Sequence, residues 1–234
     1  MKRRALMFTA ASLLAAGAAR AQVSPSPDEA ARYSGLHAAA HRGDLAALDR
    51  LLTRMLIHQP DAAALNARDA HGRTPVHVAA FARQREALRR LARAGAALEL
   101  LDNDRYDAVT IAAVADDEET LRVLLSLGAS AKLVTSRYDG TALIAAAHLG
   151  HDGVVRQLIR AGAPLDHVNN LHWTAAIEAV VLGDGGPRHQ ATLQALLDAG
   201  ASTALADRSG RTPLVLARGR GYGAMVAMLE KAAR

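Results

Sequence analysis

A repeat with a period near 33 residues runs through most of this chain, and it constrains the fold more than any other feature. Residues 74–80 read Thr-Pro-Val-His-Val-Ala-Ala. The same register returns at 107–113, 141–147, 174–180 and 212–218, with starts separated by 33, 34, 33 and 38 residues. A degenerate copy precedes them at 34–40. A second marker, the glycine of an apolar-Gly-Ala triplet, keeps nearly the same spacing at Gly95, Gly128, Gly162 and Gly200.

The chemistry of each copy predicts a helix, a turn and a second helix. A threonine that caps a helix start and a proline at the first helical position favour the beginning of a helix. The Ala-Ala pair that follows permits close approach of neighbouring helices. Apolar residues at helical spacing, such as Val154, Val155 and Leu158, then predict a second helix with a buried stripe. Glycine after that stripe is typical of a helix end, and a hairpin-like loop leads to the next copy.

These motifs resemble the ankyrin repeat, whose units begin with Thr-Pro-Leu-His and end with Leu-Leu-x-x-Gly-Ala. The resemblance covers about residues 33–232. It implies an all-α solenoid of about six helix-turn-helix units linked by hairpin-like loops, in which stacking of units buries the apolar faces. We expect units at about 33–68, 69–101, 102–135, 136–168, 169–206 and 207–234. The family implies a role in binding a protein partner, and we expect a monomer.

The first residues read as an export signal. Lys2, Arg3 and Arg4 precede an uncharged, mostly apolar stretch, and Ala19-Arg20-Ala21 fits a cleavage site. We expect a signal peptide at 1–21, cleavage after Ala21, a flexible linker at 22–32, and a periplasmic or secreted mature protein without stable membrane insertion. The apolar run is short for a transmembrane helix, but an uncleaved anchor stays an alternative. The sequence leaves open which export pathway, general or twin-arginine, carries the chain.

Composition excludes several classes of function. The net charge of +5 includes four basic leader residues, and without them 24 basic residues face 23 acidic ones. We therefore expect no nucleic-acid binding. The absence of cysteine removes thiol chemistry. His37 and His41 lack the glutamate of a metalloprotease helix, and no phosphate-binding loop or nucleophile motif occurs, so we expect no metal, no cofactor and no catalytic residue.

The fifth unit departs most from the repeat. About five extra residues lie between its helices, within 182–189, where three of four consecutive positions are glycine. Glu178 occupies a helix position that is apolar in the other units, and a buried carboxylate needs partners. We expect it to accept hydrogen bonds from the backbone of the loop 183–186 or to pair with Arg188 or His189. The possible ligand-loop residues are Glu178, Asp184, Gly185, Gly186, Arg188 and His189. The alternative is a purely structural loop over a satisfied buried acid.

The fourth and fifth loop tips hold the candidate partner-binding residues, which are Tyr138, Asp139, Asn170, His172 and Trp173. Aromatic side chains often dominate binding interfaces. His172 stands where a glycine is usual, and Trp173, the only tryptophan, starts the fifth unit. Trp173 also has a structural interpretation, as a brace between its hairpin and a neighbour. The stretch from Asn169 to His189 resembles a subgroup of exported bacterial ankyrin proteins.

Three classes of function remain open on the sequence. The first is a non-catalytic, periplasmic protein-binding module, including an inhibitor or immunity-type partner of a secreted enzyme or a helper in envelope stress defence. The second is a small-ligand or enzymatic site around Glu178, Asp184 and His189. The third is an architectural role without a tight partner. Fold alone does not choose among them, because repeat arrays bind through what their tips display.

Overall fold

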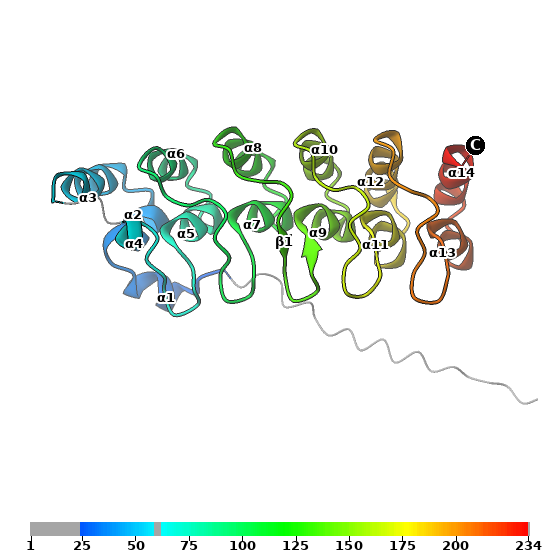
Figure 1. Ribbon diagram of the computed structural model, residues 1–234, viewed down its shortest axis with the longest axis horizontal. Helices are drawn as coiled ribbons and strands as arrows, with labels where there is room; N and C mark the ends of the chain where they lie inside the picture. The colour runs from blue at the N-terminus through cyan, green and yellow to red at the C-terminus, as the bar shows by residue number, and fades with distance from the viewer. Residues whose placement is uncertain (1–23, 59–61, 234) are drawn as a thin grey trace, which may run out of the picture.

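The computed structural model describes residues 24–58 and 62–233, and in these ranges the chain forms a row of stacked helix pairs (Figure 1). Outer helices form one layer, inner helices form the next, and the connecting loops project beyond the inner helices. The inner helices are α2 (Gly35–Arg42), α5 (Pro75–Phe81), α7 (Ala108–Val114), α9 (Ala142–Leu149), α11 (Ala175–Val181) and α13 (Pro213–Gly219). The outer helices are α3 (Leu45–His58), α6 (Arg85–Arg93), α8 (Glu118–Ser126), α10 (Asp152–Arg160), α12 (Pro187–Asp198) and α14 (Gly223–Ala232). A short helix, α4 (Ala62–Leu65), leads to the second unit.

The helix boundaries follow the predicted local chemistry. The hydroxyl oxygens of Thr141, Thr174 and Thr212 accept hydrogen bonds from the backbone N–H three residues on, and each threonine precedes an inner helix. Glycines with left-handed backbone follow four of the outer helices; Gly162, for example, has φ +78°. The sequence therefore encodes each unit boundary locally.

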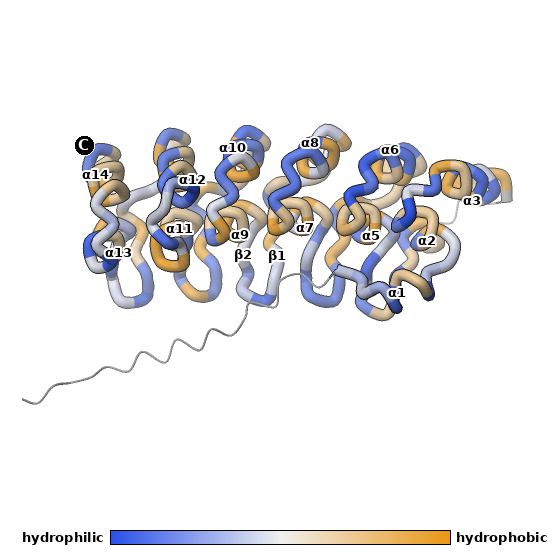
Figure 2. The backbone as a smooth tube through the Cα atoms, turned by 180° about the vertical axis from the view of Figure 1, so that it is seen from behind, coloured by the Kyte–Doolittle hydropathy of each residue, from blue (hydrophilic) through white to orange (hydrophobic). Residues whose placement is uncertain are grey.

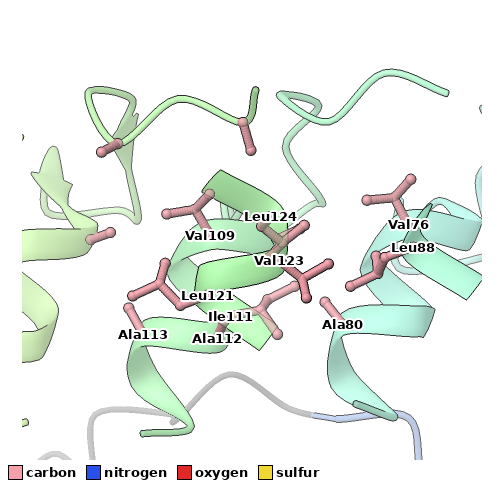
Figure 3. Packing of buried hydrophobic residues seen from close by; sticks show 14 of the residues in the cluster. Val76, Ala80, Leu88, Val109, Ile111, Ala112, Ala113, Leu121, Val123 and Leu124 are labelled. Atoms are coloured by element: carbon pink, nitrogen blue, oxygen red, sulfur yellow. The ribbon is translucent and has the colours of Figure 1, made fainter. Parts of the chain in front are cut away.

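Alanine and branched aliphatic residues fill the core between the layers. The Ala-Ala pairs of α5, α7 and α9 are almost fully buried, which lets successive inner helices pack closely. Figure 3 shows side chains of α7 and α8, among them Val109, Ile111, Leu121 and Leu124, pointing toward one another within one unit. Hydrophobic positions line the facing sides of the helices in Figure 2, whereas the loops are hydrophilic. Stacking buries a continuous core that no single unit could form.

The segment before the first unit differs from the prediction. Residues 22–32 were expected to be a flexible linker, but Pro27–Arg32 form the helix α1. Ser26 and Glu29 form a capping box, in which the Ser26 hydroxyl oxygen accepts from the Glu29 N–H and the Glu29 carboxylate accepts from the Ser26 N–H. The hydroxyl of Tyr33 donates to Asp69 at 2.8 Å. The contact between Tyr33 and Asp69 holds the end of α1 beside the loop of the second unit. The predicted signal peptide lies outside the described residues.

The loops contain the other small departure from an all-helical structure. Strands β1 (Val134–Thr135) and β2 (Gly140–Thr141) pair antiparallel in the fourth loop, with Val134 opposite Thr141 and Thr135 opposite Gly140. The tip between them is a short turn, so the fourth loop is a regular hairpin. None of the described helices is long and apolar enough to cross a membrane.

Candidate functional site

The loop tips share one polar turn that fixes their shape. One side-chain oxygen of Asp69, Asp102, Asn169 and Asp207 accepts hydrogen bonds from two backbone N–H groups, two and four residues later, at 2.8–3.0 Å. Such turns are typical of Asp and Asn, whose short side chains can bond their own backbone. Four tips therefore have nearly the same backbone and differ in the side chains that they display.

Backbone hydrogen bonds connect successive tips. The N–H of Asn103 donates to the carbonyl of His71, Ser136 donates to Arg105, and Asn170 donates to Tyr138, at 2.8–2.9 Å. The Asn170 side-chain amide also donates to the carbonyl of Arg137 at 2.9 Å. Tips two to five thus form one connected surface rather than separate loops, and Asn170 serves to hold tips four and five together.

Tyr138 and Asp139 form the fourth tip, as predicted from the sequence. Tyr138 is 43% exposed, and the Arg137 guanidinium lies over its ring at 6.0 Å. Asp139 adopts φ +52°, accepts from the Arg105 guanidinium at 2.8 Å, and its carbonyl lies 2.6 Å from the ring Nε2 of His167. Asp139 is therefore held by Arg105 and His167, whereas the Tyr138 ring is exposed beside Arg137.

His172 and Trp173 have different surroundings in the fifth tip. His172 is exposed and takes φ +63°, the left-handed conformation expected at a glycine position. Trp173 is only partly exposed, and its side chain packs against the apolar cluster of units five and six that includes Ile177, Val180 and Leu216. This packing agrees with the interpretation of Trp173 as a brace. Its role as a partner anchor stays a prediction.

Glu178 is buried as expected, but its predicted partners were wrong. The side chain is 4% exposed, and its Oε1 accepts from the amide of Asn169 at 3.0 Å. Its Oε2 lies 3.5 Å from Nδ1 of His148 and has no hydrogen-bond partner of good geometry. Neither the glycine loop nor Arg188 or His189 contacts the carboxyl group in the described interactions. The Glu178 side chain, on α11, points instead toward Asn169 in the preceding loop and toward His148 on α9.

Burial controls the electrostatics of this pair. It raises the pKa of the Glu178 carboxyl to about 7, against the lowering effect of the Asn169 amide. Burial also lowers the pKa of His148, and the neighbouring His189 and His151 lower it further. Both groups are therefore biased toward their neutral forms near neutral pH, as expected for titratable groups removed from water.

Asn169 and Glu178 form a matched exception within the repeat. Units two, three and six carry an aspartate at the turn position and an aliphatic residue nine positions later: Asp69 with Val78, Asp102 with Ile111, and Asp207 with Leu216. Only the fifth unit pairs an asparagine with an acid. An amide can donate to Glu178 while its oxygen still forms the turn, whereas a second carboxylate could not donate. Both changes are visible in the sequence, but they lie nine residues apart, and only the fold brings the two side chains into contact.

The glycine loop of the fifth unit is held by its neighbours. The Tyr222 hydroxyl donates to the carbonyl of Gly183 at 3.0 Å, and the Gln190 amide donates to the carbonyl of Gly185 at 2.7 Å. A Cβ on Gly185 would lie 2.6 Å from the Tyr222 ring. An aromatic ring of the sixth unit therefore approaches Gly185 too closely for any larger residue to fit without a shift.

Alanine at Gly185 is expected to reduce the free energy of unfolding by about 2 kcal/mol, since φ is +71° and the ring blocks the new methyl group. Gly210 is the matched control, with φ +73° and no atom within 4 Å of an added Cβ. Gly210→Ala carries the backbone cost alone, about 1 kcal/mol. Urea denaturation of both variants measures the difference. Equal losses would contradict the contact with Tyr222.

The charged residues of the loop, Asp184, Arg188 and His189, contact different parts of the structure. Asp184 Oδ1 accepts from the Gly186 N–H at 2.8 Å and lies 2.9 Å from His189 Nδ1, contacts that lower its pKa. His189 Nε2 lies 2.9 Å from the carbonyl of His148. Arg188 extends away to Asp116 at 2.7 Å. The predicted cluster of Glu178, Asp184 and His189 is therefore not one group, although His148 contacts two of its members.

Sequence reasoning missed the exposed apolar residues of units four and five. Leu171 is 38% exposed at the fifth tip, at the position equivalent to Tyr138. Leu149 and Leu182 are exposed at equivalent positions at the ends of the neighbouring helices α9 and α11. Alignment of the units on their starting threonine would have shown that these pairs occur in register. No group of three or more potential metal ligands lies within 24–58 or 62–233.

Comparison with known proteins identifies the repeat. The model of the family described as ankyrin repeats (3 copies) matches residues 36–135 and 109–207. A protein of Escherichia coli K12 named as an ankyrin repeat protein, YahD, is 33% identical over 166 residues, which are 70% of this chain and 82% of that relative.

Solved structures show the same repeat fold. An ankyrin repeat domain from Acinetobacter baumannii AYE is 40% identical and covers 85% of this chain and 97% of its own, with a TM-score of 0.75. A chain from the complex of a Bdellovibrio bacteriovorus predatory endopeptidase with its immunity protein shares the fold at 24% identity and a TM-score of 0.63, over 85% of this chain and 98% of its own. The family match, the identity to the relative and the stacked helix pairs all agree: the chain belongs to the ankyrin-repeat family.

Proposed function

We propose that this chain is a non-catalytic protein-binding module of the bacterial periplasm, and that its partner contacts tips four and five. The ankyrin fold is in general a scaffold for protein–protein interaction, which gives the class of function. Export is proposed from the basic and apolar leader with its Ala19-Arg20-Ala21 site. The main support for this binding surface is that Tyr138 and Leu171 occupy equivalent positions in tips four and five. Both side chains are exposed, and a backbone hydrogen bond joins the two tips.

The physical argument for this surface is its low entropic cost. The polar turns and the hydrogen bonds between tips already order the loops, so little conformational entropy is lost when a partner binds. Tyr138 supplies a large aromatic contact with a polar end, and Leu171 supplies an apolar neighbour. Leu149 and Leu182 add a second apolar pair on the adjoining inner helices. Exposed apolar side chains that repeat in register on neighbouring units are typical of protein contact surfaces.

Capture experiments test this proposal. Mature protein, residues 22–234, is immobilised and exposed to periplasmic extract, and a Tyr138→Ala/Leu171→Ala variant is compared with the wild type. Because both side chains are exposed, the free energy of unfolding should change by less than about 1 kcal/mol, while capture of the partner should be lost. The matched control is Val215→Ala, which removes an exposed apolar side chain from α13 of the sixth unit.

Each outcome has a defined meaning. Loss of one captured protein with the tip variant, and its retention with Val215→Ala, supports the tip surface. If that protein is a secreted enzyme, its activity with and without the module tests the inhibitor form of the proposal. Equal capture by both variants would contradict a tip surface at Tyr138 and Leu171.

A further inference from the structure

The first unit has a second surface, at the opposite end of the array from α13 and α14. α2 and α3 pack on α5 and α6 through one side, and their other sides face away from the array (Figure 1). An open groove of about 490 Å³ lies between these two helices. Its lining residues on α2 are 35, 38, 39 and 42, and on α3 they are 47, 50, 51 and 54. Both sets follow i, i+3, i+4, i+7, so each helix contributes one continuous face.

The floor of the groove is apolar and made of small residues. Ala38, Ala39 and Ala47 lie beside Leu51, and a helix could approach such a floor closely. Ile57, three residues beyond Arg54 on α3, is 72% exposed, the highest value among the large hydrophobic residues that are exposed in the described chain. Helical spacing places it on the continuation of the same face. In a solenoid, this is the side on which a preceding unit would stack.

Three arginines border this floor. Arg42 lies near the turn, and Arg50 and Arg54 lie along α3. All three are exposed, and no ion pair or hydrogen bond is found for their guanidinium groups within the described chain. Asp44 is the one acidic residue in the lining, and its Oδ1 accepts from the Ala47 N–H at 2.9 Å. Most arginines of the neighbouring α6, by contrast, are paired: Arg85 with Asp117 and Arg90 with Asp49, for example.

We propose that this groove binds an amphipathic helix of a partner protein whose apolar face is bordered by aspartate or glutamate. The three guanidinium groups and the apolar floor together match that chemistry, because arginine pairs with carboxylates in a directed way and the floor would be removed from water. The groove is distinct from tips four and five, so the proposal goes beyond the proposed function.

Charge argues against two other occupants. The leader of this chain carries Lys2, Arg3, Arg4 and Arg20 and no acid, so the groove would repel it. A second copy placed groove to groove would bring two sets of three arginines together. A second copy placed head to tail would meet the last unit, where the exposed Arg218 is paired with Glu230, the one acidic residue of α13 and α14. An acidic segment of another protein is the occupant that the charges favour.

Peptide binding tests the proposal. The probe is a fluorescein-labelled peptide of about 18 residues, or five helical turns, with a Leu/Ala face bordered by Glu. A second peptide keeps the apolar face and has Lys in place of Glu. Fluorescence anisotropy with the mature protein should show binding of the Glu peptide, at least about tenfold tighter than the Lys peptide, and weaker as salt rises from about 50 to 300 mM.

Charge-reversed variants locate the binding. Arg50→Glu/Arg54→Glu should weaken the Glu peptide by at least about tenfold and tighten the Lys peptide. Arg93→Glu/Arg160→Glu makes the same change in net charge at exposed arginines near the ends of α6 and α10, and should leave affinity within about twofold. Circular dichroism checks that both variants keep the wild-type helix content.

Several results would overturn the proposal. The first is no binding of the Glu peptide by the wild type, and the second is equal binding of the two peptides. Equal loss in both charge-reversed variants would assign the effect to overall charge. Sedimentation that shows a dimer broken by Arg50→Glu/Arg54→Glu would assign the groove to a second copy. None of these results bears on Tyr138 and Leu171, which lie in other units.

Discussion

Aspartate in place of Asn169 is expected to lower the free energy of unfolding by roughly 3 kcal/mol at pH 8, the largest effect we expect from a single change in the fifth unit. The Asn169 amide donates to Glu178 Oε1 at 3.0 Å, and both residues are almost fully buried. Aspartate keeps the turn but replaces that donor by an acceptor. Two carboxyl groups would then face each other away from water, and one would have to hold a proton or repel the other.

A double variant separates this electrostatic cost from damage to the turn. Asn169→Asp/Glu178→Val reproduces the pair Asp69 and Val78 of the second unit. It is expected to recover most of the loss and to lie within about 1 kcal/mol of the wild type, the remainder being the smaller volume of valine. Urea denaturation followed by far-UV circular dichroism at pH 8 gives all four free energies of the cycle. A double variant as unstable as Asn169→Asp would show that the loss does not come from repulsion between the two carboxyl groups.

Glutamine in place of Glu178 is expected to remove a pH dependence of stability. The folded pKa of about 7 lies above the usual glutamate value of 4.5, so between these values the folded chain holds a proton that the unfolded chain has lost. Stability contributed by this group therefore falls as pH rises, and the fall is complete above pH 7. Each pKa unit corresponds to about 1.4 kcal/mol, so the wild type should lose roughly 2–3 kcal/mol relative to Glu178→Gln from pH 5 to pH 8.

The comparison with glutamine isolates Glu178 from the other titrating groups. Glutamine can still accept from the Asn169 amide, and it stays neutral at every pH. The lowered pKa of His148 acts in the opposite direction, since protonation of the unfolded chain reduces stability as pH falls through about 6.5. The His148 contribution is present in both proteins, so it cancels when the stability of one is subtracted from that of the other. Parallel stability curves from pH 5 to pH 8 would contradict burial of an ionisable carboxyl group at this position.

The fold was predictable because each of its signals is local. Thr174 caps its helix, Gly162 ends another, and the Ala-Ala pairs are buried, all within a few residues of the motif that predicted them. The helix α1 was not predicted, because the sequence Ser-Pro-Ser-Pro at 24–27 is typical of a linker, whereas Ser26 and Glu29 also form the capping box that starts a helix. Unit boundaries need only short-range chemistry, so a single sequence carries them.

The partners of Glu178 were not predictable in the same way. The loop at 183–186 is close in sequence, but a helix points its side chains in directions set by its position in the stack. Glu178 on α11 faces Asn169 and His148, while the loop packs under Tyr222 of the next unit. The exposure of Tyr138 was predictable from its place in a tip. That of Leu149 and Leu182 required alignment of whole units.

The sixth unit is joined to the array differently from the others. Its α13 and α14 pack with Ile177, Val180 and Leu193 in an apolar cluster separate from the main core. Its tip is joined to the fifth by the Arg208 guanidinium, which donates to the carbonyl of Asn170, whereas the preceding tips are joined by backbone bonds. Because this cluster includes side chains of the fifth unit, removal of the sixth unit would expose Ile177, Val180 and Leu193 to solvent. The sixth unit therefore keeps the apolar face of the fifth unit away from water.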